Sequence, residues 1–297
     1  MILFSKILLV VTIIGFSIIS LLALYEHNIL GFEPRSIYFG QEINISKNNG
    51  TSELPQVTAE GNNVYVVWQD NTTGNYDINF AHSSDNGKSF ESVRNLSKNN
   101  GTSELPQVTA EGNNVYVVWQ DNTTGNYDIN FKSSSTNGTN FKSTRNLSKN
   151  NGTSEFPQIK FFNDVFYVIW NDRTVGTDRI YFREGRIDDS TKAPEFGSLT
   201  KLPGNGNVSK PRIFGATHSF SIVWISNFAN ASLIGYYPLN FFDDSSNTVQ
   251  LSKLSEKDKI ANVSVSGYNT NIYIVWENKK VSNSDIVFKR TGITPLD

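Results

Sequence analysis

Acidic and amide side chains recur along this 297-residue chain at a constant spacing. Three sets repeat every 51 residues, namely Glu53, Glu104 and Glu155, then Asp70, Asp121 and Asp172, and finally Gln56, Gln107 and Gln158. In the next repeat, Arg212 holds the position of the glutamines. Carboxylates with different pKa values can hydrolyse glycosides, oxygen atoms bind calcium, and a repeated polar set suits repeated contacts with a glycan.

A structural role competes with these chemical ones. Residues that occur in every repeat often serve the repeat itself, because their side chains accept hydrogen bonds from loop N–H groups. Calcium binding by pairs such as Asp70 and Asp77, helped by loop carbonyls, is a further alternative. We assign these residues to a binding face. We expect no cofactor, with calcium as the one alternative. We assign no catalytic and no metal-binding residue.

The five tryptophans indicate which elements position these side chains. Trp68, Trp119, Trp170, Trp224 and Trp276 each close a short apolar run, and they are 51, 51, 54 and 52 residues apart. Each repeat reads as four short strands of β-branched and aromatic residues separated by turns. Four antiparallel strands in about 50 residues are typical of one blade of a β-propeller.

The predicted fold is all-β, a five-bladed β-propeller closed by an N-terminal strand and preceded by one N-terminal hydrophobic helix. The last repeat stops after its third strand, whereas Phe39 is in register with Phe90 and Phe141 of the fourth strands. Residues 36–46 are therefore expected to complete the last blade, which removes a long free edge. Within residues 36–297 the blades span about 47–97, 98–148, 149–203, 204–252 and 253–297.

One turn resembles the Asp-box of the sialidase-like repeat (BNR) propellers, S-x-D-x-G-x-x-[W/F]. Residues 83–90 match it through Ser83, Asp85, Gly87 and Phe90. An Asp can accept bonds from turn amides and a Gly supplies a positive φ, so we interpret this motif as structural. The resemblance covers about residues 36–297 and implies that ligands bind on the opposite face, near the central channel.

The chain departs from sialidases in the residues that carry their chemistry. The resemblance implies an arginine triad and an Arg-Ile-Pro motif, but no arginine here is followed by Ile and Pro. Arg94 and Arg145 fall on outer strands, and sialidases close with six blades. We therefore expect a non-catalytic module that binds or scaffolds cell-surface glycans or proteins. The alternative is an exo-acting glycoside hydrolase of the sialidase-like type.

The first 25 residues predict export. About 19 uncharged residues follow Lys6, enough to span a bilayer as a helix, and Glu26 and Glu33 come after them. The positive charge before this segment places the repeats outside the cell, anchored to the membrane. A cleaved signal peptide and secretion are the alternative. Residues 26–35 are expected to form a linker to the repeats.

The net charge of −2 gives no basic surface for a nucleic acid.

Overall fold

The computed structural model describes residues 39–292 apart from 163, 175, 189–192, 203–206, 217–218, 228–231, 240–248, 254–258 and 269–270. The predicted hydrophobic helix and the linker that follows it lie outside these residues. Within them, no helix is long and apolar enough to cross a membrane. The regular structure of this part of the chain consists of strands, which confirms the all-β prediction.

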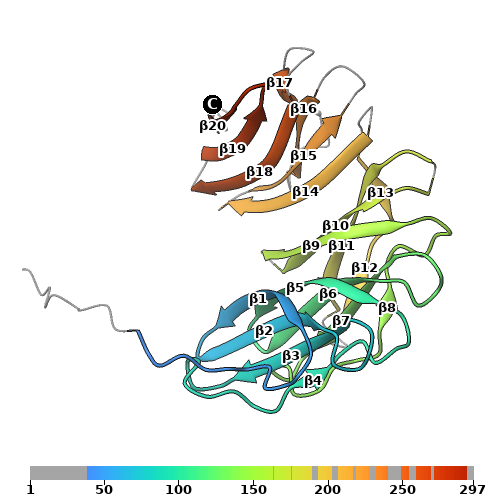
Figure 1. The fold of residues 1–297 in the computed structure, drawn as a ribbon, viewed down its shortest axis with the longest axis vertical. Coiled ribbons are helices and arrows are strands. Elements are labelled where there is room, and N and C mark those ends of the chain that lie inside the picture. The colour runs from blue at the N-terminus through green and yellow to red at the C-terminus, as the bar shows by residue number, and fades with distance from the viewer. Residues whose placement is uncertain are drawn as a thin grey trace, which may run out of the picture. The chain divides into compact units, whose positions relative to one another are not determined.

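Five antiparallel sheets follow one another in chain order (Figure 1). The first contains β1 (Ser52–Glu60), β2 (Asn63–Asp70), β3 (Asp77–Ser83) and β4 (Arg94–Asn95). The second contains β5 (Ser103–Glu111), β6 (Asn114–Asp121), β7 (Asp128–Ser134) and β8 (Arg145–Asn146). In both sheets the strands pair in sequence order, which is the arrangement expected of a propeller blade.

The remaining sheets keep this order. The third contains β9 (Ser154–Phe162), β10 (Val165–Asp172), β11 (Arg179–Ile187) and β12 (Pro194–Phe196), with β13 (Thr200–Lys201) also paired to β11. The fourth contains β14 (Asn207–Ala216), β15 (Ser219–Asn227), β16 (Ser232–Leu239) and β17 (Val249–Lys253). The fifth contains β18 (Lys259–Tyr268), β19 (Asn271–Lys279) and β20 (Ser284–Gly292). The first strand of each sheet lies next to the first strand of the following sheet.

The second strand of a sheet packs against both neighbouring sheets. On β6, Tyr116 and Val118 pack into a cluster shared with the third sheet, whereas Val115, Val117 and Trp119 pack with the first. The alternation follows from the two-residue period of a strand, which points successive side chains to opposite faces. The apolar run before each tryptophan is therefore buried on both faces.

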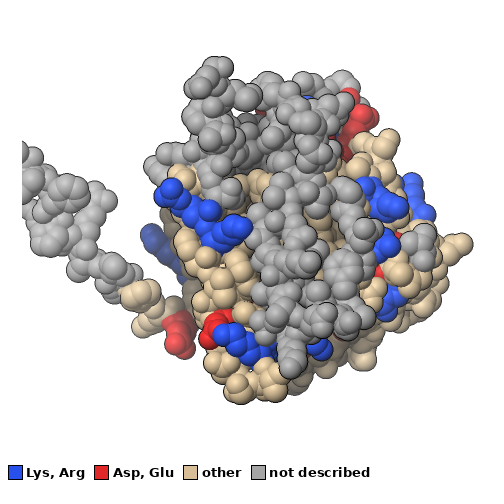
Figure 2. Space-filling model, turned by 90° about the horizontal axis from the view of Figure 1, so that it is seen from above, with Lys and Arg blue, Asp and Glu red and all other residues tan. Residues whose placement is uncertain are grey.

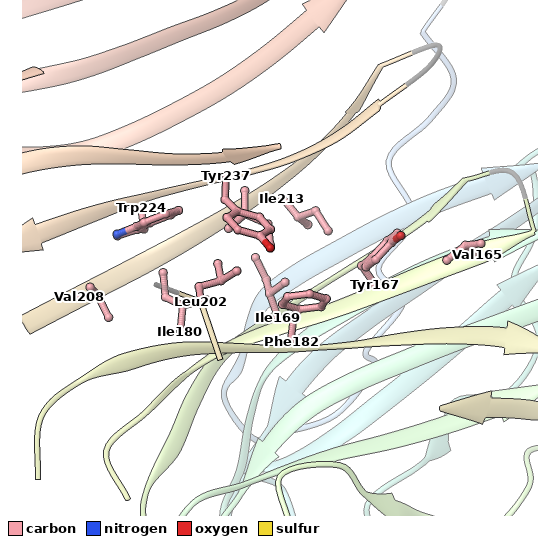
Figure 3. Close-up of a cluster of buried hydrophobic side chains, with 11 residues drawn as sticks. Val165, Tyr167, Ile169, Ile180, Phe182, Leu202, Val208, Ile213, Trp224 and Tyr237 are labelled. Carbon is pink, nitrogen blue, oxygen red and sulfur yellow. The ribbon is translucent and has the colours of Figure 1, made fainter. Parts of the chain in front are cut away.

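The core is divided among the spaces between successive sheets. Figure 3 shows one such cluster, in which Ile169 and Phe182 of the third sheet meet Trp224 and Tyr237 of the fourth. Similar clusters join the first sheet to the second, the second to the third and the fourth to the fifth. All five tryptophans are at most 5% exposed, as the repeated position predicts.

The predicted closing strand is not formed in the described part of the chain. Residues 39–46 contain no strand, and β20 pairs with β19 alone. Nor does a hydrophobic cluster of described residues join the fifth sheet to the first. Without a neighbour, Ile286 and Phe288 of β20 are 76% and 63% exposed. Ring closure and the count of five blades thus remain predictions.

Candidate functional site

A bulge follows each of the repeated glutamates. The backbone turns through a positive φ of 51° at Leu54, 53° at Leu105 and 58° at Phe156, and the pairing register shifts there. A proline follows each of these residues, which normally favours an extended conformation, so a left-handed φ is costly. Such a bulge persists only where neighbouring groups hold it, and bulges often lie beside functional sites.

A buried glutamine from the preceding sheet holds the bulge. Gln69 Oε1 accepts a hydrogen bond from the Leu105 N–H at 3.1 Å, while its Nε2 donates to Glu53 at 3.3 Å. The same contacts recur one repeat later at 3.1 and 3.2 Å, between Gln120 and Phe156 and between Gln120 and Glu104. Each glutamine therefore ties the glutamate of its own sheet to the backbone of the next sheet.

A tyrosine completes the environment of the first two glutamates. The Tyr76 hydroxyl donates to Glu53 Oε2 at 3.1 Å, and the Tyr127 hydroxyl donates to Glu104 Oε2 at 2.9 Å. Neither tyrosine is fully buried. We call this set the glutamate–tyrosine ladder, with members Glu53, Gln69, Tyr76, Glu104, Gln120, Tyr127 and Glu155.

The pKa shifts in the ladder follow from burial and from the carboxylates. Burial, and then the hydrogen bond to Glu104, raise the pKa of Tyr127 to about 12. The hydrogen bond to Glu53 is the largest cause that raises the pKa of Tyr76. Both phenols therefore stay protonated at neutral pH and act as hydrogen-bond donors. Burial also raises the pKa of the Glu155 carboxyl, against the attraction of Arg173.

The third repeat changes the partners of its glutamate. In the first two repeats the tyrosine directly precedes the residue that lies opposite the repeated aspartate. In the third repeat Arg179 lies opposite Asp172, so the residue before it, Asp178, takes the place of the tyrosine. Arg173 donates two hydrogen bonds to Asp178, at 2.8 and 3.1 Å. Asn171 takes the place of the glutamine, and its buried Oδ1 has no hydrogen-bond partner. Glu155 therefore lacks the tyrosine and glutamine donors that serve Glu53 and Glu104.

The repeated aspartates are buried at the ends of β2, β6 and β10. Asp121 accepts hydrogen bonds from Asn99 Nδ2 at 2.5 Å, from Ser103 Oγ at 2.6 Å and from the Thr123 N–H at 3.0 Å. Asp70 and Asp172 accept the same three kinds of bond. All three aspartates are 2% exposed. Their contacts fit the structural alternative, in which the carboxylate joins a loop to the end of a strand.

A metal ion at these aspartates would have to displace their internal donors. Among the residues that the structure describes, no group of three or more His, Asp or Glu side chains is arranged to hold one.

The repeated glutamines after the bulge are half-buried or exposed. Each donates to the carbonyl of the preceding proline, at 2.8 Å for Gln56, 2.9 Å for Gln107 and 3.1 Å for Gln158. Arg212, which is exposed, approaches the Pro211 carbonyl at 3.5 Å.

The low pKa of Asp70 predicts acid sensitivity. Burial alone would raise it, but hydrogen bonds from Ser52, Thr72 and Asn48 lower it to about 2. An aspartate whose folded pKa lies below its unfolded value, about 3.9, stabilises the fold above that value. This stabilisation is lost as the pH falls from about 4 to about 2. Urea unfolding across this range should show a smaller loss in Asp70→Asn than in the unaltered chain, and equal losses would contradict the assignment.

The predicted Asp-box residues form a closed turn. Asp85 Oδ1 accepts hydrogen bonds from Ser83 Oγ at 2.7 Å and from the Ser89 N–H at 2.9 Å. Gly87 has a φ of 79°, and its N–H donates to Ser83 Oγ at 2.9 Å. Hydrogen bonds within the turn, those from Ser89 above all, hold the pKa of Asp85 well below its usual range. These contacts are the ones expected of a structural motif.

The outer arginines have structural partners. Arg94 donates to the carbonyls of Gly138 and Thr139, and Arg145 donates to the Pro194 carbonyl at 2.6 Å. Arg94 thus joins the first sheet to a loop of the second, and Arg145 joins the second sheet to strand β12 of the third. On the described part of the face shown in Figure 2, basic and acidic side chains are interspersed rather than gathered into one basic surface.

Comparisons with known proteins support the fold alone. No family model and no curated protein matches the sequence, so membership of the sialidase-like family is unconfirmed. A polysaccharide lyase of family PL25, an ulvan lyase, has a TM-score of 0.52 at 12% identity, over 81% of this chain and 64% of its own. The catalytic domain of the Coprinopsis cinerea GH62 α-L-arabinofuranosidase has a TM-score of 0.47 at 10% identity, over 84% and 92%.

Some ladder residues were missed by reasoning from sequence. The predicted binding residues included the three glutamates, but not Tyr76, Tyr127, Gln69 or Gln120. These residues also recur at a spacing of 51, so the repeat carried the necessary signal. What it lacked was the contact that selects them, because a glutamine on one sheet bonds to the backbone of the next.

Proposed function

We propose that the glutamate–tyrosine ladder binds glycan chains and that the protein does so outside the cell. The observation that carries this proposal is the repetition of one glutamate–glutamine–tyrosine set in adjacent sheets, with a third glutamate in the next. Export and membrane attachment through the N-terminal segment are part of the proposal. Protein partners at the same face are the alternative to glycans.

The side chains of the ladder match the chemistry of a sugar. Carboxylate and amide groups exchange hydrogen bonds with hydroxyl groups, and a tyrosine offers an apolar ring face together with a polar tip. Gln56, Gln107, Gln158 and Arg212 follow the bulges and add further polar groups to the same strands. Repeated weak contacts along a polymer raise the apparent affinity without any strong single site.

The charge of the ladder favours neutral glycans. Glu53, Glu104 and Glu155 all carry carboxylates, and Arg173 nearby is already paired with Asp178. A uronic or sialic acid would add a like charge, which is unfavourable at short range. This expectation separates the chain from sialidases, whose arginine triad receives an acidic sugar.

The structural comparison is consistent with a glycan ligand at the level of fold. An ulvan lyase of the same family PL25 has been solved bound to -[GlcA(1-4)Rha3S]-, with a TM-score of 0.51 to this chain. The identity of 12% carries no information about residues. Because one fold hosts many functions, the side chains of the ladder, and not the fold, support glycan binding by this chain.

Binding of the full chain to immobilised neutral and acidic polysaccharides tests the proposal. We expect retention on at least one neutral polysaccharide, and we expect Glu104→Gln or Tyr127→Phe to weaken it by about tenfold, since a hydrogen bond to a charged group contributes about 1.5–3 kcal/mol. Glu195→Gln makes the same chemical change on the exposed edge strand β12 and should leave binding unaltered.

A result in which no polysaccharide is retained by the folded chain would contradict glycan binding. Retention that survives both ladder variants would place the ligand elsewhere. Preference for an acidic polysaccharide would contradict only the argument from charge. Thermal melting of each variant shows whether a loss of binding reflects unfolding.

A second candidate, glycoside hydrolysis, is favoured by the environment of Glu155. Hydrolysis needs one carboxyl group with a raised pKa as the acid and a second, ionised carboxylate. Burial raises the pKa of Glu155, whereas Glu104 accepts hydrogen bonds from Tyr127 and Gln120. Turnover of a chromogenic glycoside that disappears in Glu155→Gln but persists in Glu195→Gln would establish this activity in place of simple binding.

A further inference from the structure

We infer that the fifth sheet closes onto the first within one chain, with residues 43–47 serving as the outer strand of the fifth blade. The sequence predicted a closing strand; the structure supplies the two matching faces and the contacts between them. This inference does not depend on the proposed function.

The fifth sheet presents a face that is buried in its counterparts. Ile286 and Phe288 of β20 are 76% and 63% exposed. In the same positions of the first sheet, Ile78 and Phe80 are fully buried, because the second sheet packs over them. In the second sheet, Ile129 and Phe131 are at most 1% exposed for the same reason. The fifth sheet therefore has the side chains of a blade interface without a partner among the described residues.

The first sheet presents the complementary face. Val57 of β1 is 68% exposed, and Val66 of β2 is half-buried. Their counterparts in the second sheet are Val108, which packs against the cluster with the first sheet, and Val117, which is fully buried in it. The two exposed faces thus correspond to the two halves of an interface that is already formed between the first and second sheets.

Residues 43–47 already have the conformation of an outer strand end. The Lys47 N–H donates to Asn44 Oδ1 at 3.1 Å, and Lys47 has a φ of 46°. Lys98 and Lys149, which follow β4 and β8, have φ values of 45° and 46° and make the same bond at 2.9 Å. Residues 43–46 also line one pocket with Val66 and Trp68 of β2 and a second with residues 90–93, which directly precede β4. The segment thus lies against the first sheet without the strand that should pair with it.

Asp285 on β20 can accept hydrogen bonds from residues 43–47. Asp77 of β3 accepts hydrogen bonds from Asn95 Nδ2 at 2.7 Å and from Ser97 Oγ at 2.8 Å. Asp285 has the position of Asp77, because it lies opposite Asn278 as Asp77 lies opposite Asp70. Closure would bring Asn44 and Ser46 to Asp285, in place of its exposed ion pair with Lys280.

An aromatic contact repeats across each formed interface. Phe141 meets Phe80 edge to face with ring centroids 5.0 Å apart, and Phe196 meets Phe131 at 4.9 Å. Phe90 has the position of Phe141, and Phe288 has that of Phe80. The same contact is therefore available to Phe90 and Phe288 once the faces meet.

The occupant of both faces is the same chain rather than a second copy. The two faces are complementary but not identical, so contact between copies would be head-to-tail and would build a ring or a filament of several copies. Within one chain the two faces are covalently linked, which raises their effective concentration. Closure also removes the exposed edge of β20.

A disulfide cross-link tests closure, because the chain contains no cysteine. Asn79 lies opposite Asn95 in the pairing of β3 with β4. The corresponding pair at the closure is Val287 and Asn44, so Val287→Cys with Asn44→Cys should form a disulfide under mild oxidation. Asn79→Cys with Asn95→Cys is the positive control, and Val287→Cys with Asn146→Cys pairs two strands that closure does not bring together.

We expect the full chain with the closure pair to lose its free thiols to the same extent as the positive control, as a cross-linked monomer on a non-reducing gel. Free thiols that persist in the closure pair but not in the positive control would overturn the inference. A cross-linked dimer or ladder of oligomers would show that a second copy covers the faces.

Discussion

Replacing Asp121 by alanine is expected to lower the free energy of unfolding by about 3–5 kcal/mol. The carboxylate accepts hydrogen bonds from Asn99, Ser103 and the backbone of Thr123, and it is 2% exposed. Its removal leaves these donors without an acceptor, at a cost of about 1–3 kcal/mol for each group that stays buried. Denaturant unfolding of the variant and the unaltered chain measures this loss.

Asparagine at position 121 separates charge from shape. An amide oxygen can still accept the bond from Thr123, but the amide NH₂ would face the donors of Asn99 and Ser103. We therefore expect Asp121→Asn to lose less stability than Asp121→Ala. A loss below about 1 kcal/mol in the alanine variant, as for an ordinary surface change, would show that this carboxylate does not join the loop to the strand.

Replacing Phe131 by alanine is expected to lower the free energy of unfolding by about 3–5 kcal/mol, the usual range for a buried phenylalanine. Phe131 lies in the core between the second and third sheets, where it contacts the rings of Tyr116, Phe166 and Phe196. The cavity left behind is bounded by residues of two sheets, so the packing between these sheets should weaken. Denaturant unfolding followed by tryptophan fluorescence reports this change.

The matched control is Val281→Ala. Val281 is 87% exposed in the loop before β20, so its truncation should change stability by less than about 0.5 kcal/mol. A similar small effect in Phe131→Ala would contradict the division of the core into clusters between sheets. Because repeat proteins can unfold in parts, the transition should also be followed by circular dichroism, and the two probes should agree where unfolding is two-state.

The positions of the repeats could be predicted from the sequence because each repeat contains one tryptophan at the same place. Each tryptophan closes an apolar run, and a run with β-branched and aromatic residues favours a strand that is buried on both faces. The turn at residues 83–90 was readable for a similar reason. Its hydrogen bonds join residues four or fewer positions apart, so a local motif contains the whole interaction.

The roles of the repeated carboxylates required the tertiary structure. Glu104 and Asp121 have the same spacing and the same charge, and nothing in the sequence separates them. In the fold, Asp121 is surrounded by internal donors, whereas Glu104 lies beside Gln120 and Tyr127, which no repeated motif had brought to attention. The difference depends on which loop reaches which strand, and these are contacts between residues distant in sequence.

The sequence by itself determined the all-β class, the period of the repeats, the buried tryptophans and the local turns. All of these depend on the alternation of side chains along a strand or on bonds within a few residues. Only the tertiary structure decided which polar side chains hold neighbouring sheets together. That outcome depends on contacts between neighbouring sheets, where Gln69 bonds to the backbone of Leu105.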